Sequence, residues 1–173
     1  MKENEALINK EKALVALSAA MGAGCRTCAK GLHPMAQEAG ATNDEIERSL
    51  RVGVEMRQYA TTTVRREVDA LLGRQLLEES VPCTPTELRL EELCRVAAAV
   101  GANSSPDARR HIEAAIAAGS TEAGIELAMA LARKVRSKAA SFSDSEIGEF
   151  RHEKAEHREA GEDRGEGAAE GRP

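Results

Sequence analysis

Cys25 and Cys28 are the side chains in this sequence whose type and spacing are best suited to chemistry. They follow a Gly22-Ala23-Gly24 break and open a predicted helix, where unpaired amides and the helix dipole favour a thiolate over a thiol. Because one helical turn brings the two sulfurs together, a peroxide or disulfide attacked by one thiolate can be resolved by the other. The pair predicts dithiol redox chemistry.

A zinc half-site and plain core packing are the alternatives for this pair. Zinc is usually held by four ligands, and the sequence contains no second Cys-x-x-Cys. We therefore expect no metal site and no bound cofactor.

The composition indicates that helices position the cysteines. Hydrophobic residues make up 42% of the 173 residues but aromatic residues only 2%, and the sequence is rich in alanine punctuated by leucine. Such sequence favours close-packed helices over strands, so we expect an all-α fold. The scarcity of rings and the net charge of −5 argue against modules that stack nucleic-acid bases and contact phosphates.

No segment is predicted to enter a membrane. The longest stretch without charge runs from Ala13 to Cys25, and it is shorter than the roughly 18 to 20 residues of a spanning helix. Glu3, Glu5 and Glu11 are unlike the basic leader of an export signal. We therefore expect a cytoplasmic protein.

The sequence repeats itself at a shift of 79 residues, which aligns Leu14–Ala60 with Leu93–Ala139 without a gap. Alanine inflates the number of identities. Chance does not, however, also place both glycine breaks and a Thr-x-x-x-Ile helix start at the same shift. Identical pairs include Gly22/Gly101, Thr42/Thr121, Ile46/Ile125 and Arg57/Arg136. We predict a duplicated unit of three helices.

The helices of the two copies follow from apolar spacing and from breaks. In the first copy we predict helices over Glu5–Met21, over Cys25–Ala39 and from Thr42 to about Glu78, where Thr42 and Glu45 have the spacing of a capping box. In the second copy we predict helices over Thr86–Val100, Pro106–Ala118 and Thr121–Ala140, with Ser143 capping a last helix.

These elements predict four segments. Residues 1–80 form a first helical repeat, residues 81–85 a linker with two prolines, residues 86–150 a second repeat, and residues 151–173 a charged tail. The tail lacks Leu, Ile, Val, Met and Phe, so we expect frayed helix passing into disorder.

A specific pattern surrounds the cysteines. The apolar helix Ala13–Met21 precedes Gly24-Cys25-Arg-Thr-Cys28, His33 follows, and Ala39-Gly40-Ala41-Thr42-Asn-Asp-Glu45-Ile46 ends the stretch. The pattern resembles the carboxymuconolactone decarboxylase family, and within it the alkylhydroperoxidase D-like branch. The likeness covers about residues 5–140 when both copies count.

The resemblance implies an all-helical fold that assembles into homo-oligomers and, often, a thiol-dependent peroxide reductase. It also implies that Cys28 attacks the peroxide, that Cys25 resolves the product, and that an external dithiol such as a lipoyl group or a thioredoxin-like protein restores the pair. Helix physics alone favours Cys25 as the more acidic thiol. Which cysteine attacks first therefore stays open.

The histidine departs from the family pattern. The family histidine normally stands four residues after the second cysteine, where this sequence has Leu32, and His33 stands one residue further on. On a regular helix His33 lies roughly 140° around the axis from Cys28, although Gly31 and Pro34 can change this geometry. A catalytic and a bystander role for His33 both stay open.

The acidic residue of the family pattern is also missing from the first copy, whereas the second copy has both the acid and the histidine. An alanine stands at the position of the family's acid in the first copy, and Glu11 is a displaced substitute. In the second copy Ser104 and Asp107 replace the cysteines, yet Glu92 and His111 stand where the acid and the histidine belong. Either this copy has decayed, or Glu92 and His111 relay protons to the thiols within the chain or across a subunit contact.

We expect a thiol-disulfide redox protein that reduces a hydroperoxide or a disulfide and is itself restored by an external dithiol. Two other functions stay open: a non-enzymatic oligomeric scaffold or binding protein with a decayed site, and a lyase-like relative acting on a lactone acid. Of the remaining cysteines, Cys83 lies in the predicted linker, and Cys94 aligns with Val15, which predicts an inert core position.

Overall fold

A computed structural model of the chain describes residues 7–74 and 85–162, with side chains as far as Lys154. Within these ranges it contains six helices and no strand, which confirms the predicted all-α fold. The helices are α1 (Asn9–Ala23), α2 (Arg26–Glu38), α3 (Asn43–Leu71), α4 (Arg89–Gly101), α5 (Ser105–Ala117) and α6 (Glu122–Glu162). Residues 81–84 of the predicted linker, with Cys83, and residues 163–173 of the predicted tail lie outside the described residues.

Two compact units divide the chain, Met1–Ala139 and Ala140–Pro173, and α6 contributes to both. The first unit therefore contains the helices of both predicted repeats. In the second unit α6 continues to Glu162, and Phe142, Ile147 and Phe150 are exposed. No helix in the described part of the chain is long and apolar enough to cross a membrane.

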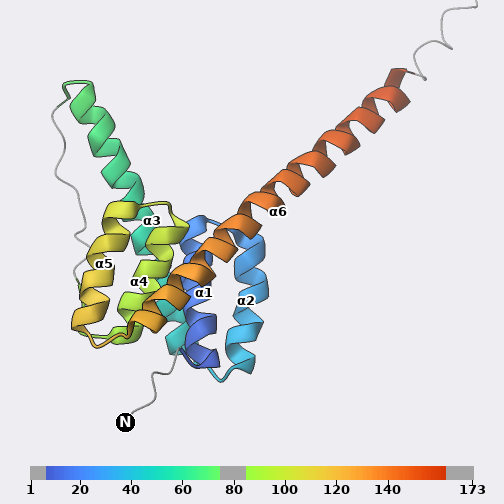
Figure 1. The fold of residues 1–173 in the computed structure, drawn as a ribbon. Helices are drawn as coiled ribbons and strands as arrows, with labels where there is room; N and C mark the ends of the chain where they lie inside the picture. Colours follow the sequence, from blue (N-terminus) through green and yellow to red (C-terminus); the bar gives the residue numbers. More distant parts are fainter. Residues whose placement is uncertain (1–6, 75–84, 163–173) are drawn as a thin grey trace, which may run out of the picture. The chain divides into compact units, whose positions relative to one another are not determined.

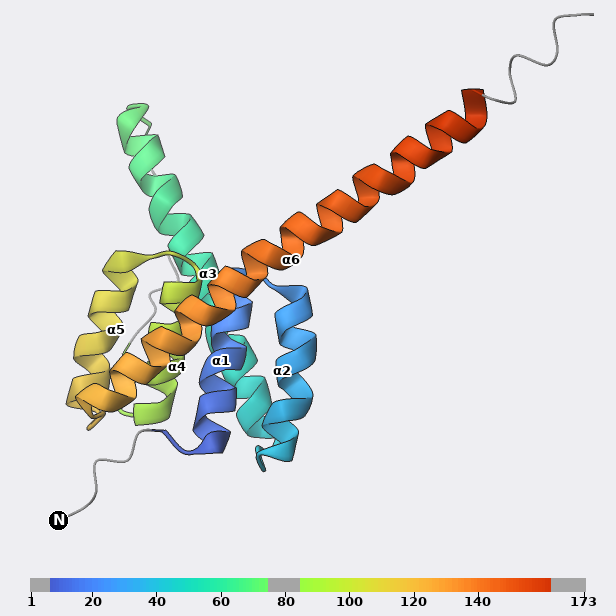
Figure 2. The same cartoon turned by 45° about the vertical axis from the view of Figure 1, so that its right-hand side comes forward.

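Helices α1 and α4 form the centre of the first unit. They lie side by side, with α2 next to α1 and α5 next to α4 (Figures 1 and 2). Every residue of α1 from Leu14 to Ala20 is buried, and so is every residue of α4 from Glu92 to Ala99. Burial on all sides places these two segments in the interior of the unit. Their many small apolar side chains are typical of such a buried helix. Four residues of α6 complete this core: Ile125, Ala128, Ala132 and Val135.

Two glycines allow the central helices to approach closely. A Cβ atom on Gly22 of α1 would lie 2.2 Å from the backbone oxygen of Ala98 in α4. A Cβ atom on Gly101 of α4 would lie 2.6 Å from the backbone oxygen of Ala19 in α1. The same contact is thus made in both directions, and neither position has room for a larger residue.

Gly22→Ala is expected to lower the free energy of unfolding by about 2 kcal/mol, because the added methyl group meets backbone that cannot move aside. Urea denaturation measures the effect. Gly31→Ala is the matched control, since Gly31 also lies inside a helix but a Cβ atom there would meet nothing within 4 Å. This control should be neutral or stabilising by up to about 1 kcal/mol. Equal stability of the two variants would contradict the close approach of α1 and α4.

The start of α3 has the predicted capping box. The Glu45 amide donates to Thr42 Oγ1 at 3.2 Å, and the Thr42 amide donates to Glu45 Oε2 at 2.8 Å. Two amides of the first helical turn are satisfied by side chains in this way.

Several predicted helix boundaries differ from the structure, and α1 and α4 begin at Asn9 and Arg89 instead of Glu5 and Thr86. Helix α3 ends at Leu71 instead of near Glu78, because Gly73 adopts a φ of 64°, a conformation that ends helices. Ser143 does not cap a separate helix, since α6 runs through it to Glu162. No glycine or proline stands between Ile125 and Ile147, so nothing in this stretch interrupts the helix.

Candidate functional site

The turn between α1 and α2 positions the two cysteines. Gly24 has a φ of 67°, its amide donates to Met21 O at 3.0 Å, and the Cys25 amide donates to Ala20 O at 2.9 Å. This is the hydrogen-bond pattern of a Schellman motif, which ends α1. Cys25 is at the same time the N-cap of α2, so the turn that ends α1 places Cys25 directly at the start of α2.

Cys25 and Cys28 form a disulfide, with their Cα atoms 5.3 Å apart. The Cys28 amide donates to Cys25 Sγ at 3.1 Å, which is the contact of an N-cap side chain with the first turn of its helix. In the reduced protein the same contact and the helix dipole would stabilise a negative charge on Cys25.

The disulfide packs against α6. Cys25 and Cys28 are each only 8% exposed, and both belong to the main hydrophobic core. Cys28 Sγ lies 3.9 Å from the backbone oxygen of Val135, which is itself buried in α6. Sequence reasoning did not single out Val135, since it stands 107 residues from Cys28.

His33 is exposed on α2, which continues through Pro34 to Glu38. The residue one turn after Cys28, Leu32, packs against the core instead. No hydrogen bond within the described residues joins His33 to either cysteine. The structure therefore does not bring this candidate to the thiols.

Glu11 lies in the first turn of α1, whereas Cys25 follows the last turn of the same helix. The Glu11 carboxylate pairs with Arg89 and accepts from the Ile8 amide at 3.2 Å. Its contacts cap α1 and join it to the residue that begins α4. Glu11 is therefore placed away from the dithiol.

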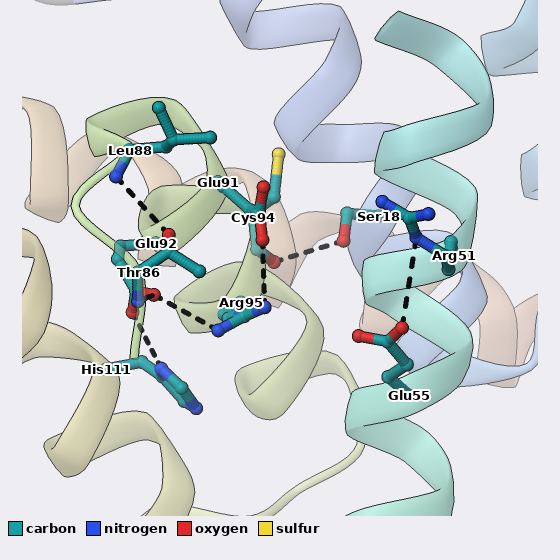
Figure 3. Close-up of polar contacts among 10 residues, drawn as sticks. All are labelled: Ser18, Arg51, Glu55, Thr86, Leu88, Glu91, Glu92, Cys94, Arg95 and His111. Carbon is teal, nitrogen blue, oxygen red and sulfur yellow. Dashed lines mark hydrogen bonds and ion pairs between the residues drawn. The ribbon is translucent and has the colours of Figure 1, made fainter. Parts of the chain in front are cut away.

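Glu92 and His111 form a fully buried pair in the other half of the unit. Figure 3 shows the contact between them. His111 Nδ1 lies 2.7 Å from Glu92 Oε2. The other carboxylate oxygen, Oε1, accepts from the Thr86 amide at 2.7 Å and from Arg95 at 3.2 Å. Sequence alignment of the two copies identified both residues, and the structure brings them together.

The electrostatics of this pair favour an ionised carboxylate. Burial by itself would raise the pKa of Glu92, but hydrogen bonds from His111 and the Thr86 amide, together with the charges of His111 and Arg95, lower it below its ordinary value. With Nδ1–H donating to Glu92, a neutral His111 carries its lone pair on Nε2. Nε2 is buried and has no hydrogen-bond partner among the described residues.

Ser104 and Asp107, which replace the cysteines in the second copy, are hydrogen-bonded to each other at the start of α5, and Asp107 is buried. They offer no thiol chemistry. Cys94 is buried in α4, where desolvation raises its pKa to about 12. This thiol stays protonated at neutral pH, as expected of an inert core position.

Within the chain, the structure does not bring the two cysteines close to the Glu92–His111 pair. The cysteines stand at the start of α2 and His111 stands in α5, and these helices flank the central pair α1 and α4 on opposite sides (Figures 1 and 2). No three His, Cys, Asp or Glu side chains in the described ranges are close enough together to hold a metal ion.

Comparisons with known proteins bear on the N-terminal part of the chain. Residues 1–68 match the family model described as the carboxymuconolactone decarboxylase family. No curated protein and no solved structure matches the chain. The matched residues include both cysteines, α1, α2 and most of α3. The match supports placing residues 1–68 in the carboxymuconolactone decarboxylase family.

Proposed function

We propose that this chain is a thiol-disulfide redox protein of the alkylhydroperoxidase D-like kind, and that it reduces a hydroperoxide with Cys25 and Cys28. The observation that carries the proposal is the Cys25–Cys28 disulfide with Cys25 as the N-cap of α2. A helix N-terminus stabilises a thiolate, and a second sulfur one turn away can resolve the oxidised product.

The reaction has three steps. A thiolate attacks the terminal oxygen of the hydroperoxide and breaks the O–O bond, so that the attacked oxygen stays on the sulfur as a sulfenic acid. The other oxygen leaves as an alkoxide and takes up a proton to give an alcohol. The second thiol then displaces the hydroxyl group as water and forms the disulfide. An external dithiol, such as a lipoyl group or a thioredoxin-like protein, reduces the disulfide by exchange and is itself oxidised to a disulfide.

The geometry favours Cys25 as the thiolate. Its sulfur accepts an amide hydrogen bond, whereas Cys28 Sγ lies beside the Val135 carbonyl, which can accept a hydrogen bond from a thiol but repels a negative charge. The family resemblance assigns the attack to Cys28. The two single-cysteine variants treated in the Discussion separate these assignments.

A direct test maps the cysteines after oxidation. The reduced protein is mixed with one equivalent of an alkyl hydroperoxide, and the products are identified by mass spectrometry. Rapid formation of the Cys25–Cys28 disulfide, with Cys94 unmodified, is the expected result. Slow oxidation scattered over several cysteines would contradict the proposal and favour a scaffold with a decayed site.

One observation favours a second candidate function. The Glu92–His111 pair is buried and separate from the thiols, and with Nδ1–H donating to Glu92, the Nε2 of a neutral His111 has no hydrogen-bond partner in the part of the chain that the structure describes. Such a pair suits proton abstraction, which a lyase-like member of the family acting on a lactone acid would use. That activity would survive replacement of both cysteines, whereas peroxide reduction would not.

The proposal includes a tandem duplication and a homo-oligomer in the cytoplasm. Reciprocal glycine contacts between α1 and α4 support the duplication, because Gly22 and Gly101 are equivalent at the 79-residue shift.

Exposed apolar side chains along the end of α3 support self-association: Val64, Val68 and Leu71. Light scattering of the purified chain tests this association.

A further inference from the structure

Arg57 reaches from α3 to the turn that carries Cys25. Its Nη1 donates to the backbone oxygen of Gly22 at 2.9 Å. A Cβ atom on Gly24 would lie 2.4 Å from Nη1, 2.6 Å from Cζ and 2.9 Å from Nη2 of the same side chain. The flat guanidinium therefore lies directly against the Cα atom of Gly24, the residue before Cys25.

Comparison with the equivalent arginine in the other half of the unit shows which contact is specific to Arg57. Arg136, which is equivalent to Arg57 at the 79-residue shift, donates to Val100 O at 3.2 Å and to Asn103 Oδ1 at 2.9 Å. Asn103 is the equivalent of Gly24 and also has a positive φ, of 61°. Both arginines thus satisfy a carbonyl at the end of a central helix. Only in the first half does a glycine let the guanidinium lie against the backbone that leads into a cysteine.

In the described part of the chain, two charged side chains adjoin the turn that carries Cys25, and both are arginines. Helix α1 ends there in apolar residues and backbone carbonyls, α6 contributes Val135 with its carbonyl, and α2 contributes Arg26, which follows Cys25 in the chain. Arg57 contributes positive charge from α3. Each side chain with a full charge named here is a cation, so the charges of the turn favour an anion on the sulfur.

We propose that Arg57 is a positioning residue of the dithiol, whose guanidinium holds the Gly22–Cys25 turn and stabilises the thiolate of Cys25 in the reduced protein. This inference rests on the proposed function. The guanidinium lies against Gly24, the residue that precedes the cysteine favoured as the thiolate by the N-cap geometry. Since Arg57 is partly solvent-exposed, screening by water limits the effect, and we expect removal of the charge to raise the thiol pKa by about 0.5 to 1 unit.

Titration of a single thiol tests this expectation. In a Cys28→Ser, Cys83→Ser background, Cys25 is the one thiol besides Cys94, and burial raises the pKa of Cys94 to about 12, so the two titrations can be told apart. The ultraviolet absorbance of the thiolate is followed against pH. Arg57→Met should raise the pKa of Cys25 by about 0.5 to 1 unit, and Arg57→Lys, which keeps the charge, should raise it by less than half as much.

Arg136→Met is the matched control. It removes the equivalent arginine and its contact with a carbonyl at the end of the other central helix, so it should lower thermal stability about as much as Arg57→Met while leaving the pKa of Cys25 unchanged. An unchanged pKa in Arg57→Met, or an equal rise in Arg57→Lys and Arg57→Met, overturns the inference. Should Arg57→Met fail to fold, Arg57→Gln replaces it as the uncharged variant, with the same expected rise.

The two hypotheses fail in different experiments. If alkyl hydroperoxide does not form the Cys25–Cys28 disulfide in the unmodified chain, the proposed function is wrong whatever the titration shows. If the disulfide forms but the thiol pKa does not depend on Arg57, the proposed function stands and the role of Arg57 is wrong.

Discussion

Cys28→Ser is expected to lower the rate of hydroperoxide turnover with a dithiol reductant by at least about 100-fold, because the sulfenic acid formed on Cys25 has no partner within one turn. The first attack survives if Cys25 is the thiolate. This variant should then consume one equivalent of peroxide quickly and accumulate sulfenic acid on Cys25. Peroxide loss and intact-protein mass measure the two quantities.

Cys25→Ser separates the two assignments of the attacking sulfur. Its turnover should fall as far as that of Cys28→Ser, and it should also fail to consume the first equivalent of peroxide quickly, because the N-cap sulfur is gone. Rapid single turnover in Cys25→Ser alone would assign the attack to Cys28, as the family resemblance implies. Cys94→Ala is the control and should keep full turnover, since its thiol is buried and protonated. Full turnover in both single variants would exclude the dithiol mechanism.

Glu92→Gln is expected to lower the free energy of unfolding by about 3 kcal/mol, because removing one member of a buried ion pair leaves the others uncompensated. The carboxylate takes hydrogen bonds from three groups, His111, Arg95 and the Thr86 amide, and a glutamine offers one oxygen in place of two. Urea denaturation at neutral pH measures the loss. Glu91→Gln is the control, since Glu91 pairs with Arg95 and not with His111, and it should cost less than Glu92→Gln because it removes one ion pair where Glu92→Gln removes two.

The same carboxylate predicts a pH dependence of stability. The pKa of Glu92 is lower in the folded chain than its ordinary value of 4.5. A lowered pKa means that the ionised form stabilises the fold, so this contribution is complete above 4.5 and is lost as the pH falls through the folded value. Glu92→Gln should therefore show a flatter decline of stability below pH 4.5 than the unmodified chain. An identical decline in both would show that Glu92 does not contribute.

Local sequence patterns predicted the helix starts and ends near the cysteines. Thr42 and Glu45 form the capping box that their spacing indicates, and the glycine break ends α1 immediately before Cys25. These features depend on hydrogen bonds between residues a few positions apart, so they can be identified without knowledge of the packing. The same reasoning failed at Ser143, where a cap residue stands inside a stretch that nothing interrupts.

Side-chain direction around a helix was harder to predict. The sequence left both roles open for His33, because Gly31 and Pro34 can bend a helix. Helix α2 instead continues through Pro34, with Leu32 toward the core and His33 toward solvent. Glu92 and His111 could be matched by the repeat, but their contact and the hydrogen bond from the Thr86 amide depend on how α4, α5 and the Thr86 segment pack.

By itself, the sequence determined that this protein is helical, that a Cys-x-x-Cys pair opens a helix, and where the breaks between helices near that pair fall. These properties follow from periodicity, caps and glycine, which act over one or two turns. Only the tertiary structure decided what covers the pair and which charge approaches it. Val135 stands 107 residues from Cys28, and Arg57 stands 35 residues from the Gly22 carbonyl that it contacts. Contacts at such separations arise from the packing of whole helices, which no local pattern specifies.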